Sequence, residues 1–290
     1  MRGIMRGRGL IKVMNETYNP EIIRGYFDVL ADGEWARLEA SLEARVSFHL
    51  HRSYLREFVA AGAEVLEVGA GPGRFTLELA ALGARVTVSD VSQVQLELNR
   101  ARVAAAGCEA AVVARKVLDI VDLSDLPSQQ FDAVVAYGGP LSYVMERADE
   151  ALGELLRVTK RGGYVLLSVM SLVGATRKFS ASVVKWAHER SLGEVEQVIR
   201  TGDQTGDIAR LHHCHMYRWT ELAALIKRQP CTLVAASAAN FLSVNQDEAL
   251  AAMLHDAGLW ETFLRWEREF CREPGALDGG THIIAVVQRI

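Results

Sequence analysis

Apolar runs of strand length alternate with helical stretches from residue 64 to about residue 170, and this alternation restricts the fold more than any other feature. Helices are expected at Arg74–Leu82, Gln93–Ala106 and Glu150–Thr159. Two strands joined through a helix run parallel, because the crossover must lay that helix across the sheet. Both faces of such a sheet are covered, so its strands are apolar almost throughout. The expected strands are Glu64–Val68, Arg85–Ser89, Ala111–Leu118, Phe131–Ala136 and Tyr164–Val169.

The segments before and after this region complete the expected fold. Apolar residues recur at helical spacing before residue 60, and two more strands are expected at Thr232–Ala238 and His282–Gln288. We therefore predict an α/β fold, with a doubly wound, Rossmann-like sheet of seven mostly parallel strands. The predicted domains are an N-terminal helical cap at residues 1–60 and a Rossmann-like domain at 61–290. An insertion after the fifth strand is expected at about 171–216.

Composition excludes several classes of protein. Half of the residues are hydrophobic and 23% are charged, which is enough apolar material for a large core. The net charge of −4 provides no basic footprint for nucleic acid or an anionic membrane. No apolar run reaches the ~18 residues of a membrane-spanning helix, and Met1–Leu10 lacks the apolar stretch of a secretory signal. We therefore expect a cytoplasmic protein that binds neither nucleic acid nor a membrane.

A glycine-rich turn after the first expected strand is the strongest local signal for a ligand. Gly69, Gly71 and Gly73 follow a buried strand and lead into a helix, with Glu67 two residues before the first glycine. Glycines let a backbone approach a ligand closely, and a helix N-terminus favours acceptor groups. A nicotinamide-binding loop would have its third glycine at position 74, which is Arg74 here. The alternative interpretation is a tight connection without a ligand.

Two aspartates stand at the ends of the next two expected strands. Asp90 ends the second strand, where a carboxylate can accept hydrogen bonds from both hydroxyls of a ribose. Asp119 and Ile120 follow the third strand, where the acid can accept from the adenine amine while the aliphatic side chain packs on the ring. Either aspartate alone is equally typical of a helix N-cap. Together with the glycine turn they indicate a cofactor that contains adenosine.

With these motifs the sequence resembles the class I S-adenosylmethionine-dependent methyltransferases. The resemblance is carried by Glu67–Gly73, Asp90 and Asp119-Ile120, by the fourth strand Phe131–Ala136, and by the turn into the fifth strand at Arg161–Leu166. It covers residues 60 to 170 well. The N-terminal helices also resemble those of bacterial small-molecule methyltransferases, in which they close over the cofactor.

This resemblance implies S-adenosylmethionine as the cofactor and S-adenosylhomocysteine as the product. The glycines would hold the methionine part, and the segment after the fourth strand would lie near the sulfonium. The implied cofactor-binding residues are Glu67, Gly69, Gly71, Gly73, Asp90, Val91, Asp119, Ile120, Tyr137 and Gly138.

The segment after the fourth strand limits which classes of molecule can be the methyl acceptor. Tyr137–Tyr143 contains no amide or carboxylate, so it does not match the enzymes that methylate amino groups of nucleic acids or the metal-dependent catechol type. We therefore expect a small-molecule acceptor and no metal ion. Tyr143 is a candidate to contact the substrate. Tyr18 and Tyr26 in the cap are candidates for the same role and for covering the methionine end, with core packing as the alternative.

A general base is needed only if the acceptor must lose a proton. His212 and His213 are the candidate catalytic residues, because they follow the expected insertion and can face the pocket. With Cys214 and His215 they also allow a metal-binding interpretation, although the spacing matches no standard zinc site. A third alternative is that they are half-buried strand residues with backbone partners.

Three questions stay open at the level of the sequence. The acceptor atom can be oxygen, nitrogen or carbon, and the oligomeric state, with a homo-oligomer among the alternatives, is not determined. The chain can also be a non-catalytic protein that binds S-adenosylmethionine. A nicotinamide-dependent oxidoreductase is the remaining alternative, disfavoured by Arg74.

Overall fold

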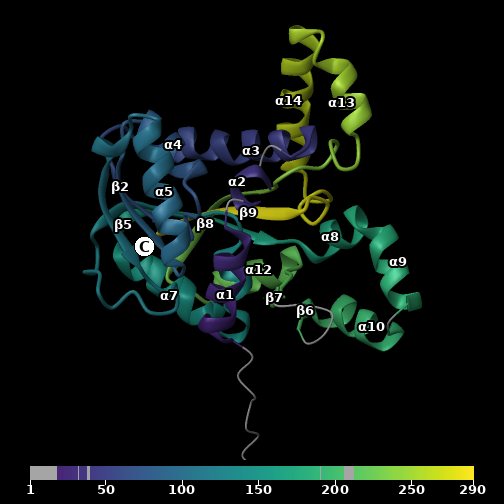
Figure 1. Ribbon diagram of the computed structural model, residues 1–290, viewed down its shortest axis with the longest axis horizontal. Helices are drawn as coiled ribbons and strands as arrows, with labels where there is room; N and C mark the ends of the chain where they lie inside the picture. The colour runs from purple at the N-terminus through teal and green to yellow at the C-terminus, as the bar shows by residue number, and fades with distance from the viewer. Residues whose placement is uncertain (1–17, 32, 38–39, 190, 206–211) are drawn as a thin grey trace, which may run out of the picture.

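A seven-stranded sheet forms the centre of the molecule in the computed structural model, which describes residues 18–31, 33–37, 40–189, 191–205 and 212–290 (Figure 1). The strand order is β3-β2-β1-β4-β5-β9-β8, and β6 and β7 form a separate two-stranded sheet. The strands are β1 (Glu64–Val68), β2 (Arg85–Asp90), β3 (Val112–Val117), β4 (Phe131–Ala136), β5 (Thr159–Met170), β6 (Asp203–Gln204), β7 (Cys214–His215), β8 (Cys231–Ala238) and β9 (His282–Arg289).

The helices connect these strands and cover the sheet. They are α1 (Pro20–Leu30), α2 (Gly33–Arg37), α3 (Leu42–Phe58), α4 (Arg74–Ala81), α5 (Gln93–Ala105), α6 (Pro140–Tyr143), α7 (Ala148–Val158), α8 (Leu172–Lys178), α9 (Ser180–Glu189), α10 (Leu192–Thr201), α12 (Trp219–Lys227), α13 (Asp247–Met253) and α14 (Ala257–Cys271), with 3₁₀ turns at Glu109–Ala111 and Met145–Arg147.

The predicted mostly parallel sheet is confirmed. The pairs β1–β2, β1–β4, β2–β3 and β4–β5 are parallel, whereas β9 runs antiparallel to both β5 and β8. Strand β5 is longer than the expected Tyr164–Val169. It pairs with β9 from Tyr164 to Met170, and Thr159 at its start pairs with Phe131 of β4, so tertiary pairing extends it beyond its apolar run.

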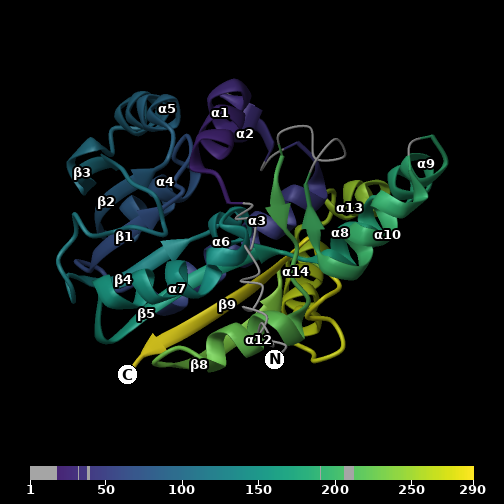
Figure 2. The ribbon, with the colours of Figure 1, turned by 90° about the horizontal axis from the view of Figure 1, so that it is seen from below.

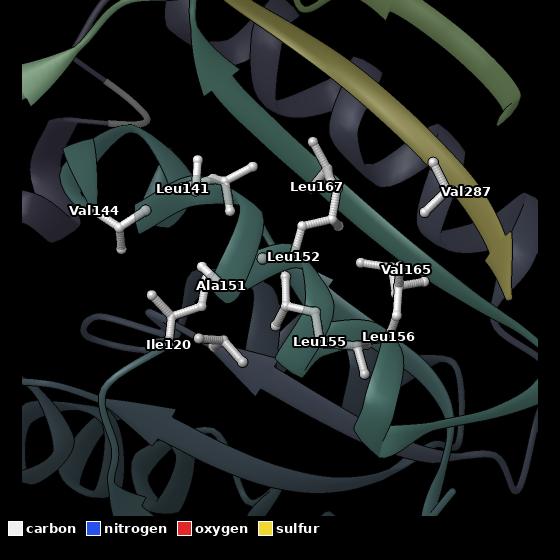
Figure 3. Packing of buried hydrophobic residues seen from close by; sticks show 14 of the residues in the cluster. Ile120, Leu141, Val144, Ala151, Leu152, Leu155, Leu156, Val165, Leu167 and Val287 are labelled. Carbon is white, nitrogen blue, oxygen red and sulfur yellow. The ribbon is translucent and has the colours of Figure 1, made fainter. Parts of the chain in front are cut away.

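Two apolar clusters lie on the two faces of the sheet. On one face, α7 and α12 cover the sheet, and Leu152, Leu155 and Leu156 of α7 lie near Val165 and Leu167 of β5 (Figure 3). On the other face, α3 and α4 pack through residues that include Leu50 and Leu79, both with no exposed surface. The central strand β4 is buried on both sides and is apolar apart from Asp132, whereas the edge strand β3 is partly exposed and carries Arg115 and Lys116.

The helical region expected before residue 60 is divided into α1, α2 and α3. Helix α2 ends at Arg37, and α3 begins after Ser41, whose hydroxyl accepts a hydrogen bond from the backbone N–H of Ala44. Such a capping side chain satisfies a backbone donor that has no partner within the helix, so a new helix begins there. Residues 1–17 and Leu38 of the expected cap lie outside the described residues.

The chain between β5 and α12 forms an arm beside the sheet. Helices α8 to α10 lie at one side of the molecule, and the β6–β7 ribbon connects them to α12 (Figure 2). Within the described residues, no helix combines the length and the apolar character needed to cross a membrane.

Candidate functional site

A cavity lies where the parallel strands β1 to β4 end. It encloses about 880 Å³ of empty space, part of it open to solvent. The loops after these four strands line it on one side, and α1, α2 and α6 line it on the other. Ligands of open α/β sheets bind at this edge, because loops from several strands meet there. Eight of the ten predicted cofactor residues line the cavity, namely Gly69, Gly71, Asp90, Val91, Asp119, Ile120, Tyr137 and Gly138.

All three glycines of the turn have positive φ angles, which suit glycine, and two of them line the cavity. Gly69 has φ +64°, and a Cβ atom there would lie 2.6 Å from Cγ of Pro140. Gly71 has φ +53°, and its N–H donates to Oδ2 of Asp90 at 2.8 Å. Gly73 does not line the cavity: it caps α4 with φ +101° and faces Asn99. The third glycine therefore shapes the turn into the helix, and its contact with the cofactor stays a prediction.

Asp90 is held at the end of β2 with 5% of its surface exposed. In addition to the bond from Gly71, Oδ1 accepts the backbone N–H of Ser92 at 2.9 Å. Burial raises the pKa of Asp90 to about 6, against these backbone hydrogen bonds, which lower it; the Glu34 carboxylate raises it further. Each carboxylate oxygen has one such backbone donor and can accept another hydrogen bond.

Asp119 forms a hydrogen bond with Tyr18 of the N-terminal cap. The Tyr18 hydroxyl donates to Oδ2 at 2.7 Å, and the backbone N–H of Val121 donates to Oδ1 at 3.0 Å. Burial, followed by the bond to Asp119, raises the pKa of Tyr18 above its ordinary value. The backbone N–H of Tyr18 also donates to Oε1 of Glu146 at 3.1 Å. These bonds hold Tyr18 at the Asp119 end of the cavity, and its expected contact with the substrate stays a prediction.

Glu67 was expected to bind the cofactor, but it does not line the cavity. Its Oε2 accepts the Thr76 hydroxyl at 2.6 Å, and Asn99 donates to that hydroxyl at 2.9 Å. Only 2% of Glu67 is exposed, and burial raises its pKa to about 8. Alternation along β1 directs this side chain toward α4 rather than toward the loop that follows, and its contact with the cofactor stays a prediction.

The end of β4 supplies a buried phenol. Tyr137 lines the cavity with 3% of its surface exposed, and its ring packs against those of Phe75 and His51. Burial raises its pKa well above the ordinary value. Within the described residues, no group forms a hydrogen bond with its hydroxyl oxygen. A buried polar atom without a partner is costly, so this hydroxyl is suited to a ligand or a water molecule.

An aromatic cluster, formed by Tyr26, Phe27, Tyr143 and His212, lies beside the cavity. Phe27 and Tyr143 line the cavity, and their rings meet edge to face at 5.2 Å. Oη of Tyr143 and Nε2 of His212 are 3.0 Å apart. Tyr26 stacks on His212 with the ring centroids 4.8 Å apart. Tyr26 and His212 do not line the cavity themselves but lie behind Tyr143 and Phe27, and their expected roles stay predictions.

The neighbouring histidines have different surroundings. His213 does not line the cavity, so only His212 of the two candidate catalytic residues is connected to it. His215 bonds to Asp203 through Nδ1 at 2.7 Å and to Glu221 through Nε2 at 2.8 Å. Burial lowers the pKa of His215, but the two carboxylates outweigh this and raise it to about 9. No group of three metal-ligating side chains occurs in the described part of the chain.

Two charged residues of the cavity are not recognisable from sequence alone. Glu34 of α2 approaches Gly71, and Arg74 lines the cavity at the start of α4. The Arg74 guanidinium donates to the carbonyl of Trp35 and lies 3.7 Å from the centroid of its ring. In the sequence, Arg74 is notable only because it occupies the position where a nicotinamide-binding loop would have its third glycine. Its contact with α2 depends on how the N-terminal helices fold over the sheet.

Comparisons with known proteins agree with this geometry. Residues 65–163 match a family model described as a methyltransferase domain. A demethylmenaquinone methyltransferase of Clavibacter sepedonicus is 37% identical over 113 residues, which cover 38% of this chain and 42% of that protein. The chain thus spans less than half the length of the curated relatives it matches.

Solved structures share the fold over most of their length. A methyltransferase of Mesorhizobium loti that depends on S-adenosylmethionine has a TM-score of 0.55 at 18% identity, over 84% of this chain and 98% of that one. A geranyl diphosphate C-methyltransferase of Streptomyces coelicolor A3(2), solved with Mg²⁺ and S-adenosyl-L-homocysteine, has a TM-score of 0.52 at 14% identity, over 82% and 77%. Residues 65–163 of this chain thus match a methyltransferase domain, and the solved structures share the fold of the chain.

Proposed function

We propose that this chain transfers a methyl group from S-adenosylmethionine to a small-molecule acceptor without using a metal ion. One observation carries the proposal: Gly71, Asp90 and Asp119, from three different strand ends, line a single cavity. The glycine-rich backbone suits the methionine part of the cofactor, and a carboxylate that can accept further hydrogen bonds suits the ribose. The second carboxylate, beside an aliphatic side chain, suits the adenine.

The residues present fit S-adenosylmethionine. The open backbone of Gly69 and Gly71 would lie against the methionine part, and Asp90 would accept the ribose hydroxyls. Asp119 would accept the adenine amine, with Ile120 on the ring and Tyr18 closing that end through its bond to Asp119. When bound, the cofactor supplies an activated methyl group on a sulfonium.

The chain itself would contribute position and exclusion of water. The acceptor side is lined by Ile23, Phe27, Tyr143 and Val144, so an acceptor there meets mainly apolar surface. Holding a nucleophile about 3 to 3.5 Å from the methyl carbon can provide much of the rate enhancement. Metal independence rests on the lining of this side, where Ile23, Phe27, Tyr143 and Val144 include no carboxylate.

The cofactor assignment predicts that Asp90→Ala weakens S-adenosylhomocysteine binding by ~1.5 to 3 kcal/mol, because hydrogen bonds to a charged group are lost. Titration calorimetry measures this, with Asp125→Ala, an exposed aspartate outside the cavity, as the matched control. Asp90→Asn keeps the size of the side chain and separates loss of charge from loss of the Gly71 contact.

Two results would contradict the proposal. Equal affinity of the wild type and Asp90→Ala for S-adenosylhomocysteine would remove the ribose assignment. Binding of NAD(H) in place of S-adenosylhomocysteine would favour an oxidoreductase. Methyl transfer to a panel of small molecules then distinguishes an enzyme from a protein that only binds the cofactor.

A further inference from the structure

We propose that Tyr143 and His212 form a proton relay for an acceptor that carries a phenolic or enolic hydroxyl group. This inference rests on the proposed function and specifies its acceptor. Tyr143 lines the cavity, whereas His212 lies behind it, with Oη and Nε2 3.0 Å apart. The acceptor would therefore meet the tyrosine hydroxyl, and the histidine would hold the proton.

The position of Tyr143 is set by packing on several sides. Its side chain belongs to α6, directly after the β4 end that carries Tyr137 and Gly138. Phe27 meets its ring edge to face, and only 9% of the residue is exposed. A hydroxyl held by packing next to the cavity can be aligned with a reacting oxygen before that oxygen arrives.

The position of His212 suits a group that accepts a proton and later releases it. Tyr26 stacks on the imidazole at a centroid distance of 4.8 Å and an interplanar angle of 19°. An aromatic face attracts a cation, so this stacking favours the protonated ring. His212 is half-buried rather than enclosed, and Gln204 donates to its carbonyl oxygen, which fixes the backbone. The residue thus keeps part of its surface in contact with solvent.

The transfer balances in atoms and charge. With the imidazole proton on Nδ1, Nε2 of His212 accepts the Tyr143 hydroxyl. As the acceptor oxygen forms its bond to the methyl carbon, its proton moves to Tyr143 and the Tyr143 proton moves to His212. The carbon–sulfur bond breaks, and its electron pair returns to sulfur, which loses its positive charge. The imidazolium of His212 then releases its proton to solvent.

The chemical class of the acceptor follows from the basicity of the His212 imidazole. A neutral amine can attack through its lone pair and needs no base beforehand, so a relay would add little for it. An aliphatic hydroxyl is a far weaker acid than imidazolium. A phenol or enol, with a pKa near the ~10 of tyrosine, is closer to the ~6.5 of histidine, so proton transfer to imidazole assists its attack. The apolar walls of Ile23, Phe27 and Val144 suit such a molecule.

The test uses 4-nitrophenol as the acceptor probe, with the protein saturated by S-adenosylhomocysteine, which lacks the sulfonium charge. Visible absorbance follows formation of the nitrophenolate as the pH is varied. In the wild type the midpoint for the bound probe should lie about one pH unit below that of the free probe. Tyr143→Phe and His212→Gln should return the midpoint to the free value.

The variants separate a relay from a structural hydrogen bond. The amide oxygen of His212→Gln can still accept from Tyr143 but cannot hold a proton, so a purely structural pair would leave the midpoint unchanged. Tyr164→Phe on β5 and His188→Gln on α9 are matched controls outside the cavity and should behave as the wild type.

Each outcome has a defined meaning. A wild-type midpoint equal to that of free 4-nitrophenol, no binding of the probe, or an unchanged midpoint in His212→Gln would overturn the relay. Calorimetry with S-adenosylhomocysteine on the same samples tests the proposed function independently. Normal cofactor binding without a change in midpoint removes only the relay, whereas loss of cofactor binding in the wild type removes the proposed function itself.

Discussion

The two sides of the cavity are built in different ways. The strand-end group, Gly69, Gly71, Asp90 and Asp119, comes from loops that follow neighbouring parallel strands, and backbone hydrogen bonds hold its carboxylates. The aromatic cluster comes from α1, α6 and the segment beside β7, so its contacts join residues far apart in the chain. Tyr143 and His212, for example, are 69 positions apart. The first arrangement follows from the topology of the sheet, and the second depends on side-chain packing alone.

This difference indicates which side of the cavity can change in sequence while the sheet is kept. A parallel sheet brings the same strand ends together whatever ligand is used, so the strand-end group suits a cofactor shared by many enzymes. The packing of the aromatic cluster can change without disturbing the sheet. We therefore expect substitutions in the strand-end group to affect both stability and cofactor binding, and substitutions in the aromatic cluster to affect mainly the acceptor.

The largest expected effect is that of Gly69→Ala. At φ +64° a side chain is strained, and its Cβ would lie 2.6 Å from the Pro140 ring. Strain and overpacking together should lower the free energy of unfolding by ~2 to 5 kcal/mol. Gly62→Ala is the matched control, because Gly62 has φ +79° with no atom within 4 Å of the added carbon. It should lose only the ~1 to 2 kcal/mol of backbone strain.

Urea unfolding of both variants measures the difference, and calorimetry with S-adenosylhomocysteine measures binding. Similar losses of stability in Gly69→Ala and Gly62→Ala would show that Pro140 moves aside. The close approach at Gly69 would then not be a constraint on the strand-end group.

The next effect concerns the pH dependence of stability. Burial raises the pKa of Glu67 from 4.5 to about 8, so the folded chain keeps a proton that the unfolded chain releases. The stability from this group is fully present below about pH 4.5 and is lost as the pH rises through 8. Glu67→Gln should remove this loss, which amounts to a few kcal/mol, while the amide oxygen still accepts from Thr76.

Urea unfolding at pH 5 and pH 8 tests this prediction. Glu64→Gln, on the same strand but at its partly exposed start, is the control and should decline with pH as the wild type does. A decline in Glu67→Gln as steep as that of the wild type would show that Glu67 is ionised throughout this range.

The smallest effect is expected in the segment that carries His212. The pKa of His215 is raised to about 9 by Asp203 and Glu221, so its stabilising charge is fully present below pH 6.5 and is lost as the pH rises through 9. His215→Gln should cost about 1 kcal/mol at pH 7 and less at pH 10, because the carboxylate partners are more than 40% exposed and solvent weakens the attraction.

Thermal unfolding at both pH values measures this change, with His188→Gln on the exposed side of α9 as the control. The prediction fails if His215→Gln is destabilised equally at pH 7 and pH 10. Equal losses would show that the charge on His215 does not stabilise the segment that carries His212.

Much of the strand-end group could be predicted from the sequence. The bounds expected for β1 and β4 match those of the structure, and Asp90 and Asp119 lie at the predicted edge of the sheet. This succeeds because strands and their ends are encoded by local apolar runs and glycines. Glu67 shows the limit: its position before the glycine turn suggests a ligand contact, but alternation along β1 directs its side chain toward Thr76.

The sequence by itself determined the parallel sheet, the glycine turn and the acids at successive strand ends, because each depends on neighbouring residues and on a crossover rule. Only the tertiary structure decided that Tyr18 closes the Asp119 end, that Arg74 holds α2, and that His212 reaches the cavity through Tyr143. These contacts join segments separated by tens of residues. No local pattern specifies such pairs, because their partners meet only when the helices pack over the finished sheet.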